Sequence, residues 1–350
     1  MPLSSSPPER TARRNLTLEL CKLIASCFVV FIHVPFPAPA GEWVLCLARF
    51  AVPMFFAISG WYSYGAAPNK LLHRMVRVLA LELVGIAISL LFRAISAVYT
   101  GWDPIQALLS ALPGREAMKL WLLLSDDPFS GHLWYLSASA FSYGILWLYT
   151  RSGCRKWGYS PLYVLGAILL AAHFAMGELC RYTGLRVLFK IPRSGIFFGL
   201  PMFLMGMFLR QYRDRLLRKG NTPALVLLLV LGTGMSLAEW KFFGVYDLYM
   251  GLLISVPAVL LLTGRHPGVP RGLEKAAALC GSISTGIYLI HITVRDGYQA
   301  FFQWRLEPHM GASEPWLQPL IILFVSLASA ALWKCLVSCC SCLFVQRKKE

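Results

Sequence analysis

A series of apolar runs, each long enough to cross a bilayer, restricts the fold of this chain more than any other feature. A transmembrane helix needs about 20 predominantly apolar residues. Runs of about this length lie near 17–36, 43–66, 76–98, 132–150, 161–178, 194–210, 222–240, 247–264, 277–300 and 317–343. With 57% hydrophobic and only 14% charged residues, the chain has too little polar surface for a water-soluble globule. We expect an all-α, polytopic membrane helix bundle with about ten transmembrane helices.

The basic residues predict the orientation of this bundle. The formal net charge is +16, and the bases gather in short segments between apolar runs, which is typical of membrane topology rather than of nucleic-acid binding. If both termini are cytosolic, 20 of the 33 Lys and Arg lie in cytosolic segments, 8 in external segments and 5 within runs. The positive-inside rule therefore favours cytosolic termini. The external segment 179–193 holds four bases, which are either tolerated there or bind an anionic substrate.

The chain divides into one membrane domain with two polar tails. We expect a disordered cytosolic tail at 1–15, a membrane domain at 16–343 and a basic cytosolic tail at 344–350. The first apolar run lacks a small-residue cleavage site, so we expect no removable signal peptide. No internal repeat is evident, and no Cys or His group has zinc-site spacing, so we predict no metal site. Any chemistry must therefore occur between the helices.

The first predicted helix carries charged and titratable residues, which are costly at membrane depth and usually face the bundle interior or a cavity. Lys22 and His33 are eleven residues apart. They therefore share one helix face, roughly 16 Å apart along the axis. Glu19 lies within one turn of Lys22 and can pair with it. A structural role explains each residue alone, as an interfacial histidine or a snorkelling base. Together on one face they favour a functional site.

Three further predicted helices bring polar residues to a similar depth. The second helix has Arg49 in its outer part, and Pro53 predicts a kink. The small residue Ser59 near its inner end permits close packing or leaves room for a ligand. The other contributions are His132 and Trp134 at the start of the fourth helix and His291 in the ninth. Several titratable groups from different helices at one depth predict a cavity with a reactive centre.

These fragments resemble acyltransferase family 3, a family of multipass membrane O-acyltransferases. That family has a basic residue, ten intervening residues and a His on its first helix, which Lys22 and His33 match, although many members have Arg at the first position. Further matches, in the family's order, are RFAVPMFFAISGW, HLWYL at 132–136, GIFFGLPMFLMGM and the IYLIH stretch that ends at His291. The resemblance extends over about residues 14 to 340.

The resemblance implies O-acyl transfer across a membrane, with no bound cofactor. An acyl group, often acetyl or succinyl, passes from cytosolic acyl-CoA, the co-substrate, to a hydroxyl of an extracytoplasmic glycan or lipid-linked sugar, such as a cell-envelope polysaccharide. The expected location is a bacterial cytoplasmic membrane. His33 is then the catalytic general base, a role that suits a neutral imidazole of pKa near 6.5, and Lys22 its basic partner on the donor side. We place in substrate binding Arg49, His132, Trp134, His291, Glu19 and Ser59.

Two other functions remain open. One is a transporter or exporter of a small envelope precursor that uses the same helix bundle without acyl transfer. The other is a non-catalytic scaffold, which a degenerate family member would become, although Lys22, His33 and Arg49 are all retained. The basic segments 70–77 and 210–219 attract the phosphates of coenzyme A or only satisfy the positive-inside rule. The tryptophans near the outer side stack on sugar rings or form an interfacial belt.

Overall fold

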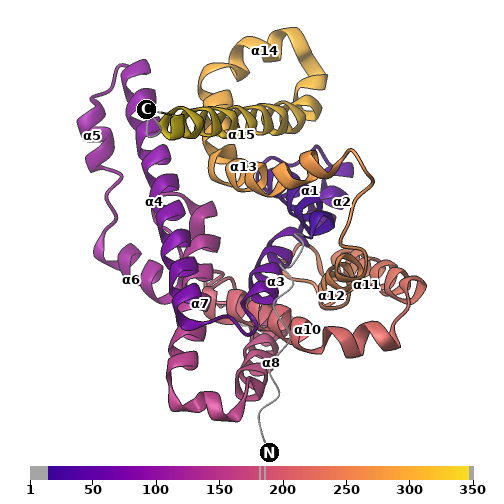
Figure 1. Cartoon of the computed structure of the whole chain (residues 1–350). Coiled ribbons are helices and arrows are strands. Elements are labelled where there is room, and N and C mark those ends of the chain that lie inside the picture. Colours follow the sequence, from indigo (N-terminus) through magenta and orange to yellow (C-terminus); the bar gives the residue numbers. More distant parts are fainter. Residues whose placement is uncertain (1–14, 181–182, 185–186, 347–350) are drawn as a thin grey trace, which may run out of the picture.

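The computed structural model describes the backbone of residues 15–180, 183–184 and 187–346, and the side chains of 15–177, 180, 183–184 and 187–335. All regular structure in this part of the chain is helical, which agrees with the predicted all-α fold (Figure 1). Of the predicted tails 1–15 and 344–350, residues 1–14 and 347–350 lie outside the described residues, so the boundaries of the membrane domain stay predictions.

Seven helical segments of the described chain are long and apolar enough to cross a bilayer. They are α1 (Leu16–His33), α2 with α3 (Ala40–Ala48 and Ala51–Ser63), α4 (Pro68–Tyr99), α8 (Ser160–Phe174) with the first residues of the π-helical turn η3 (Ala175–Leu179), α11 (Thr222–Phe243), α13 (Glu274–Phe301) and α15 (Glu314–Gln346), which is counted together with the short helix before it over Gln303–Cys335. By the length and composition of these helices, the chain is a multi-pass membrane protein.

The other three predicted runs also form helices. These are α7 (Trp134–Arg151) after the 3₁₀ turn η1 (Gly131–Leu133), the π-helical turn η4 (Gly195–Gly199) with α10 (Leu200–Lys219), and α12 (Leu252–Arg265). The apolar helix α12 has only 14 residues, and α10 continues into a basic segment. The composition of α7 is more polar because it buries Ser139, Ser142 and Tyr143 inside the bundle, where a side chain does not face lipid. The exact number of crossings stays a prediction.

Short helices occupy the connections between these segments. The predicted external connection 100–131 contains α5 (Pro104–Leu109) and α6 (Arg115–Leu124). The turn η2 (Gly153–Trp157) lies between α7 and α8, and α14 (Gln303–Met310) with η5 (Gly311–Ser313) lies between α13 and α15.

The second predicted run is helical on both sides of the position where Pro53 disturbs it. Helix α2 ends at Ala48, and α3 begins at Ala51. Proline has no N–H, and its ring clashes with the carbonyl four residues earlier, which here belongs to Arg49. Pro53 therefore breaks the helical hydrogen-bond pattern at residues 49 and 50. These two residues keep right-handed helical dihedral angles, so α2 and α3 form one 24-residue segment that is disturbed where the predicted kink places it.

The bounds of α1 fix the positions of its polar residues. The Asn15 side chain caps the first turn by accepting a hydrogen bond from the Leu18 amide, 3.0 Å away. The helix ends at His33 because Pro35 and Pro37 follow in the sequence and cannot continue it. His33 therefore lies at the last helical position, where its ring is free of the next turn.

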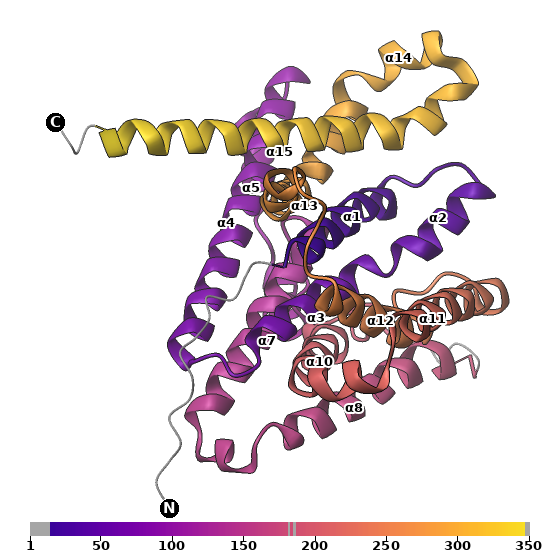
Figure 2. The same cartoon turned by 45° about the vertical axis from the view of Figure 1, so that its right-hand side comes forward.

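The helices pack around α1, α3, α10 and α13. Helix α13 lies between α1 and α15, α4 lies against α7, and α11 lies against α12 (Figures 1 and 2). Helices α3 and α10 approach most closely where glycine removes side chains. A Cβ on Gly60 would overlap the carbonyl of Phe203, and one on Gly206 would overlap that of Ala57. Gly60 is therefore needed for the close contact between α3 and α10, whereas its neighbour Ser59 lines a cavity.

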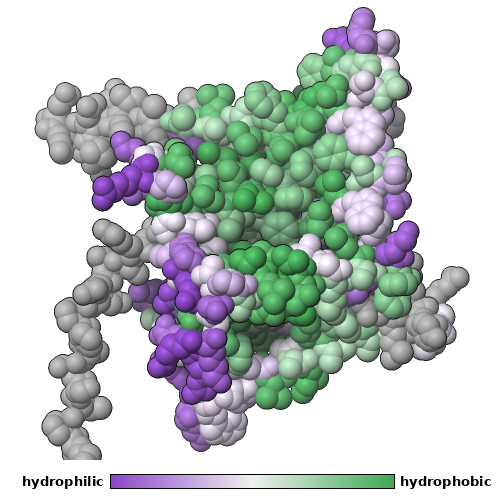
Figure 3. All heavy atoms as spheres, turned by 90° about the vertical axis from the view of Figure 1, so that its right-hand side faces the viewer, coloured by the Kyte–Doolittle hydropathy of each residue, from purple (hydrophilic) through white to green (hydrophobic). Residues whose placement is uncertain are grey.

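One end of the bundle gathers the start of α1 and several connections rich in basic residues. Contacts that join these segments are Thr17 Oγ1 to the His266 carbonyl (2.6 Å), Arg265 Nη1 to the Gly220 carbonyl (2.6 Å) and Arg210 over the Trp61 ring (5.6 Å). We call this end the basic face and the other end, where α1 stops at His33, the opposite face. A belt of apolar side chains lies between two polar edges (Figure 3).

Candidate functional site

Three histidines from three different segments meet at the end of α1. The ring centroid of His33 lies 5.2 Å from that of His291 in α13 and 6.5 Å from that of His132 in η1. The centroids of His132 and His291 are 5.0 Å apart. His33 is partly exposed, whereas the other two are buried. Of the three rings, His33 is therefore the most open to a ligand.

Hydrogen bonds hold the two buried rings, and for His291 they show which nitrogen carries the proton. Nδ1 of His291 lies 2.8 Å from the Tyr288 carbonyl and 3.1 Å from the Ile287 carbonyl. Carbonyls only accept, so Nδ1 carries the proton, and Nε2 of the neutral ring bears a lone pair. The Ser130 hydroxyl bonds to Nδ1 of His132 at 2.8 Å. Neither Nε2 atom, of His132 or of His291, has a hydrogen-bond partner among the described residues.

A buried polar network holds the segment that carries His132. The Tyr288 hydroxyl donates a short hydrogen bond to the His132 carbonyl. Asp127 accepts hydrogen bonds from the amides of Phe129 and Ser130 at 2.8 and 2.9 Å, so it fixes the turn before η1. Burial raises the pKa of the Asp127 carboxyl. This turn thus determines where the His132 ring lies.

Helix α4 anchors the same region from the other side. Its buried Glu82 accepts hydrogen bonds from Trp121 Nε1, at 3.1 Å, and from the Ser137 hydroxyl. Trp121 belongs to α6 and Ser137 to α7. One carboxylate in a membrane helix therefore ties α6 and the start of α7 to α4, which is how such a costly buried charge is compensated.

A small chamber surrounds His33, with room for about one water molecule. Its polar lining residues are His33, Arg49, His132, Trp134, Tyr135, Arg193, Asp247 and Tyr288. Nη1 of Arg49 forms an ion pair with Oδ1 of Asp247 at 2.7 Å. The guanidinium of Arg193 lies over the Trp134 ring, 5.0 Å from its centroid.

A larger cavity adjoins the chamber at the opposite face. This outer cavity, of about 330 Å³, shares Arg49, Arg193 and Asp247 with the chamber. Its remaining lining is mostly apolar and aromatic, and includes Phe174, Phe189, Pro192 and Tyr246.

A third cavity, of about 400 Å³, lies toward the basic face and shares Tyr135 and Tyr288 with the chamber. This inner cavity is lined by the cationic side chains Lys22, Arg74 and Arg77 and by small hydroxyl residues that include Ser59, Ser139 and Ser284. Arg74 is held in place by donating to the Tyr62 carbonyl at 2.7 Å. The inner cavity therefore has positive charge in its lining, and it adjoins the histidine chamber through Tyr135 and Tyr288.

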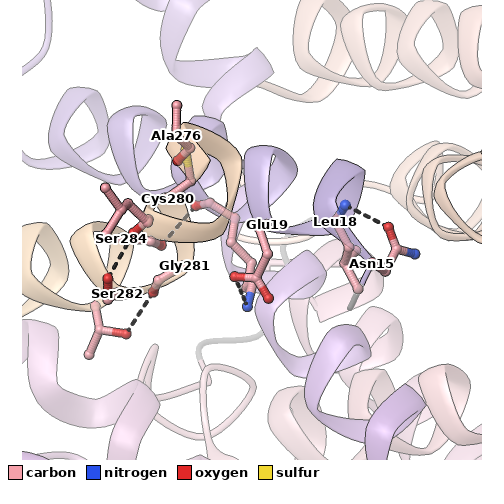
Figure 4. A network of polar contacts seen from close by, with 11 residues as sticks. Asn15, Leu18, Glu19, Ala276, Cys280, Gly281, Ser282 and Ser284 are labelled. Carbon is pink, nitrogen blue, oxygen red and sulfur yellow. Dashed lines mark hydrogen bonds and ion pairs between the residues drawn. The ribbon is translucent and has the colours of Figure 1, made fainter. Parts of the chain in front are cut away.

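Lys22 is paired at the inner cavity. Its Nζ lies 2.7 Å from Oε2 of Glu19, and the two side chains are 22% and 7% exposed. Helix α13 makes room for this pair at Gly281, beside Glu19 (Figure 4). A Cβ there would overlap Oε2 of Glu19 and lie 3.1 Å from Nζ of Lys22. Ser284, one turn further along α13, donates to the Lys22 carbonyl at 2.9 Å.

The predicted residues thus lie in or beside adjoining cavities. Lys22 and Ser59 line the inner cavity, and Glu19 pairs with Lys22. His33, Arg49, His132 and Trp134 line the chamber, and the ring of His291 lies behind the rings of His33 and His132. Their roles in catalysis and binding remain predictions.

Sequence reasoning missed Asp247, Tyr135 and Tyr288, and it left Arg193 within an ambiguous basic loop. Of that loop, Lys190 pairs with Asp126 at 2.5 Å and Arg193 reaches the chamber, whereas Arg181 and Arg186 lie outside the described residues. An acidic residue in a short external connection was the available signal for Asp247.

Two further observations concern the described part of the chain. An apolar cavity of about 320 Å³ between α1, α2, α11 and α12 contains none of the predicted site residues. No group of three or more His, Cys, Asp or Glu among the described residues could hold a metal ion.

Comparison with known proteins gives one match. The model of a family described as an acyltransferase domain matches residues 15–334, nearly the whole chain. Neither the curated proteins nor the solved structures contain a match.

Proposed function

The chain belongs to this acyltransferase family, and from that membership we propose that it is a membrane-bound O-acyltransferase. It moves an acyl group, acetyl or succinyl, from cytosolic acyl-CoA to a hydroxyl of an extracytoplasmic glycan or lipid-linked sugar. We place it in the cytoplasmic membrane of a bacterium, where its product is an O-acylated cell-envelope polysaccharide or its precursor.

The observation that carries the proposal is a series of three adjoining cavities. The inner and outer cavities lie at opposite ends, and each shares lining residues with the chamber that contains His33. Transfer between substrates on opposite faces of a membrane needs a donor site, an acceptor site and a reactive group where they meet. The inner cavity, the outer cavity and His33 supply these in that order.

The inner cavity suits the donor because coenzyme A carries several phosphates. Lys22, Arg74 and Arg77 provide three cations around its lining. Arg74 and Arg77 form planar forks that match a phosphate, whereas Lys22 supplies a point charge further in. The pantetheine arm of acyl-CoA then extends along the inner cavity to Tyr135 and Tyr288, so that its thioester faces the chamber of His33.

His33 acts as the general base in the chamber. A hydroxyl is a poor nucleophile near neutral pH, and a neutral imidazole can take its proton as the oxygen attacks the thioester carbonyl. A C–O bond forms and the C–S bond breaks. The thiolate of coenzyme A leaves and takes up a proton, for which the imidazolium of His33 is the nearest source. The guanidinium groups of Arg49 and Arg193 favour the negative charge that develops on the carbonyl oxygen.

This scheme needs ten crossings with cytosolic termini, which we retain as part of the proposal. An even number of crossings leaves both ends of the chain on the basic face, beside the donor site. The basic connections gathered there support this orientation through the positive-inside rule.

The experiment that tests the proposal uses inverted membrane vesicles that contain the protein. Labelled acetyl-CoA or succinyl-CoA is supplied to the exposed cytosolic face, and label in the glycan fraction is measured. Removal of a general base costs about 10²–10⁴-fold in rate. The expected result is a loss of this size in His33→Ala. The matched control His309→Ala changes an exposed histidine on α14 and should stay within about twofold of the wild type.

Two results would count against the enzyme. Label transfer that survives His33→Ala excludes His33 as the base. Movement of a sugar precursor across the membrane without acyl transfer, unchanged in His33→Ala, would favour the transporter instead.

A further inference from the structure

Arg193 holds a positive charge that no described side chain neutralises. No carboxylate among the described residues forms an ion pair with Arg193, and its guanidinium contacts the rings of Trp134 and Phe189, with centroids at 5.0 and 5.6 Å. The second arginine of the outer cavity, Arg49, is matched by Asp247 at 2.7 Å. Within the described part of the chain, the two guanidinium groups and one carboxylate leave the outer cavity with one excess positive charge.

The packing of the next two residues fixes the position of Arg193. Ser194, which is fully buried, caps η4 by accepting from the Phe197 amide at 3.3 Å. The next residue, Gly195, packs closely against the end of α6 and against α7, so that a Cβ would lie 2.7 Å from the Ser125 hydroxyl and 3.2 Å from the Cα of Ala138. The backbone at Arg193 is therefore held in place by its neighbours, and two aromatic rings hold its side chain.

An arginine held in this way presents a planar fork of N–H donors. Ring contacts cover the face of the guanidinium and leave its edge available for hydrogen bonds. Carboxylates and phosphates are the groups that such an edge binds in bidentate fashion. The aromatic and apolar walls of the cavity, among them Phe174, Phe189 and Tyr246, suit the faces of a sugar ring.

From these contacts we infer that the outer cavity binds an acidic acceptor, a sugar that carries a carboxylate or phosphate, through Arg193. The inference rests on the proposed function, since it assigns the acceptor that function requires. Arg193 lines both the outer cavity and the His33 chamber, so an anion held there places a neighbouring hydroxyl of the same sugar at His33. Arg49 with Asp247 forms the other wall of this passage.

The test measures binding, separately from acyl transfer. Purified protein in phosphatidylcholine nanodiscs is titrated with glucuronate and galactose 1-phosphate, and with glucose and galactose as neutral partners. Hydrogen bonds between charged groups imply that Arg193→Gln weakens binding of the two anionic sugars about 10- to 100-fold and leaves the neutral sugars unchanged. Arg193→Lys, which keeps the charge and loses the fork, should fall in between.

Arg305→Gln is the matched control. Arg305 is exposed and also lies over a tryptophan, Trp304, at 4.7 Å, but it lines none of the three cavities. It should bind all four sugars as the wild type does. Equal affinity of the wild type for charged and neutral sugars would overturn the inference. An equal loss of affinity in Arg193→Gln and Arg305→Gln would overturn it as well.

A separate arm distinguishes the acceptor from the acyl group as the source of the anion. Acetyl and succinyl differ by a carboxylate, so the binding of acetyl-CoA and succinyl-CoA is compared in the same variants. A loss confined to succinyl-CoA in Arg193→Gln would overturn the inference and assign the charge to the donor. Selective binding of acidic sugars with no acyl transfer under any condition would support the acidic site while refuting the proposed function.

Discussion

Replacement of Gly281 by alanine tests how the Lys22–Glu19 pair is held in the membrane. The added carbon would overlap Oε2 of Glu19, lie 2.9 Å from its Cδ and lie 3.1 Å from Nζ of Lys22, whereas ordinary contact begins at 3.4 Å. Glu19 is only 7% exposed and cannot swing into water. The carboxylate must therefore shift, which strains α1 against α13 and weakens the ion pair.

The magnitude follows from two terms. Overpacking costs about 1–3 kcal/mol, and a weakened hydrogen bond between charged groups costs about 1.5–3 kcal/mol. The two terms sum to about 2.5–6 kcal/mol, and because the overlapped atom is the end of a side chain, we expect Gly281→Ala to lower the free energy of unfolding by an amount near the lower end of this range. It should also raise the KM for acyl-CoA, because Lys22 lines the inner cavity. Unfolding in mixed detergent micelles, followed by tryptophan fluorescence, measures the stability term.

Two comparisons make this prediction specific. Gly234 lies in α11 with no atom within 4 Å of a would-be Cβ, so Gly234→Ala should be neutral or slightly stabilising. In a Glu19→Ala background the overlapping carboxylate is gone, so Gly281→Ala should cost less than about 1 kcal/mol there. If Gly281→Ala is as harmless as Gly234→Ala, or costs the same with and without Glu19, the packing explanation is refuted.

Three further predictions concern the donor site, the turn before His132 and the membrane topology. Arg74→Gln should raise the KM for acyl-CoA about tenfold in the vesicle assay with little change in kcat, whereas Arg305→Gln should change neither. Burial raises the pKa of Asp127 above its unfolded value of about 3.9, so its contribution to stability is fully present below that pH and is lost as the pH rises through the raised value. Asp127→Asn should therefore remove part of the pH dependence of the melting temperature above about pH 4; an unchanged profile would contradict the assignment. In a cysteine-free background, an impermeant maleimide should label Ser152→Cys only from the cytosol and Ser313→Cys only from outside, and the reverse pattern would refute the proposed orientation.

Patterns within single helices could be predicted from the sequence. The spacing of Lys22 and His33 on one face of α1 follows from the helical period, and both residues line adjoining cavities. The effect of Pro53 was predicted as a kink, and the helical hydrogen-bond pattern is broken at residues 49 and 50 because the proline obstructs the carbonyl of Arg49. The family resemblance is confirmed by the match to residues 15–334.

Contacts between distant segments could not be predicted. Arg49 and Asp247 are 198 residues apart, and no periodicity relates them. Tyr288 was one aromatic residue among many until its hydroxyl proved to reach the His132 carbonyl. Arg193 counted only as part of a charge excess, because the packing of Gly195 against α7 determines where its side chain lies.

Sidedness of transfer is the most direct test of the three adjoining cavities. Sealed proteoliposomes are prepared with an acceptor sugar enclosed, and labelled acyl-CoA is added only outside, to protein oriented with its basic face outward. Adjoining cavities that meet at His33 predict labelled sugar inside intact vesicles, dependent on His33 and absent when the orientation is reversed. Label transfer that occurs only when donor and acceptor share one face of the membrane would contradict transfer through the three cavities.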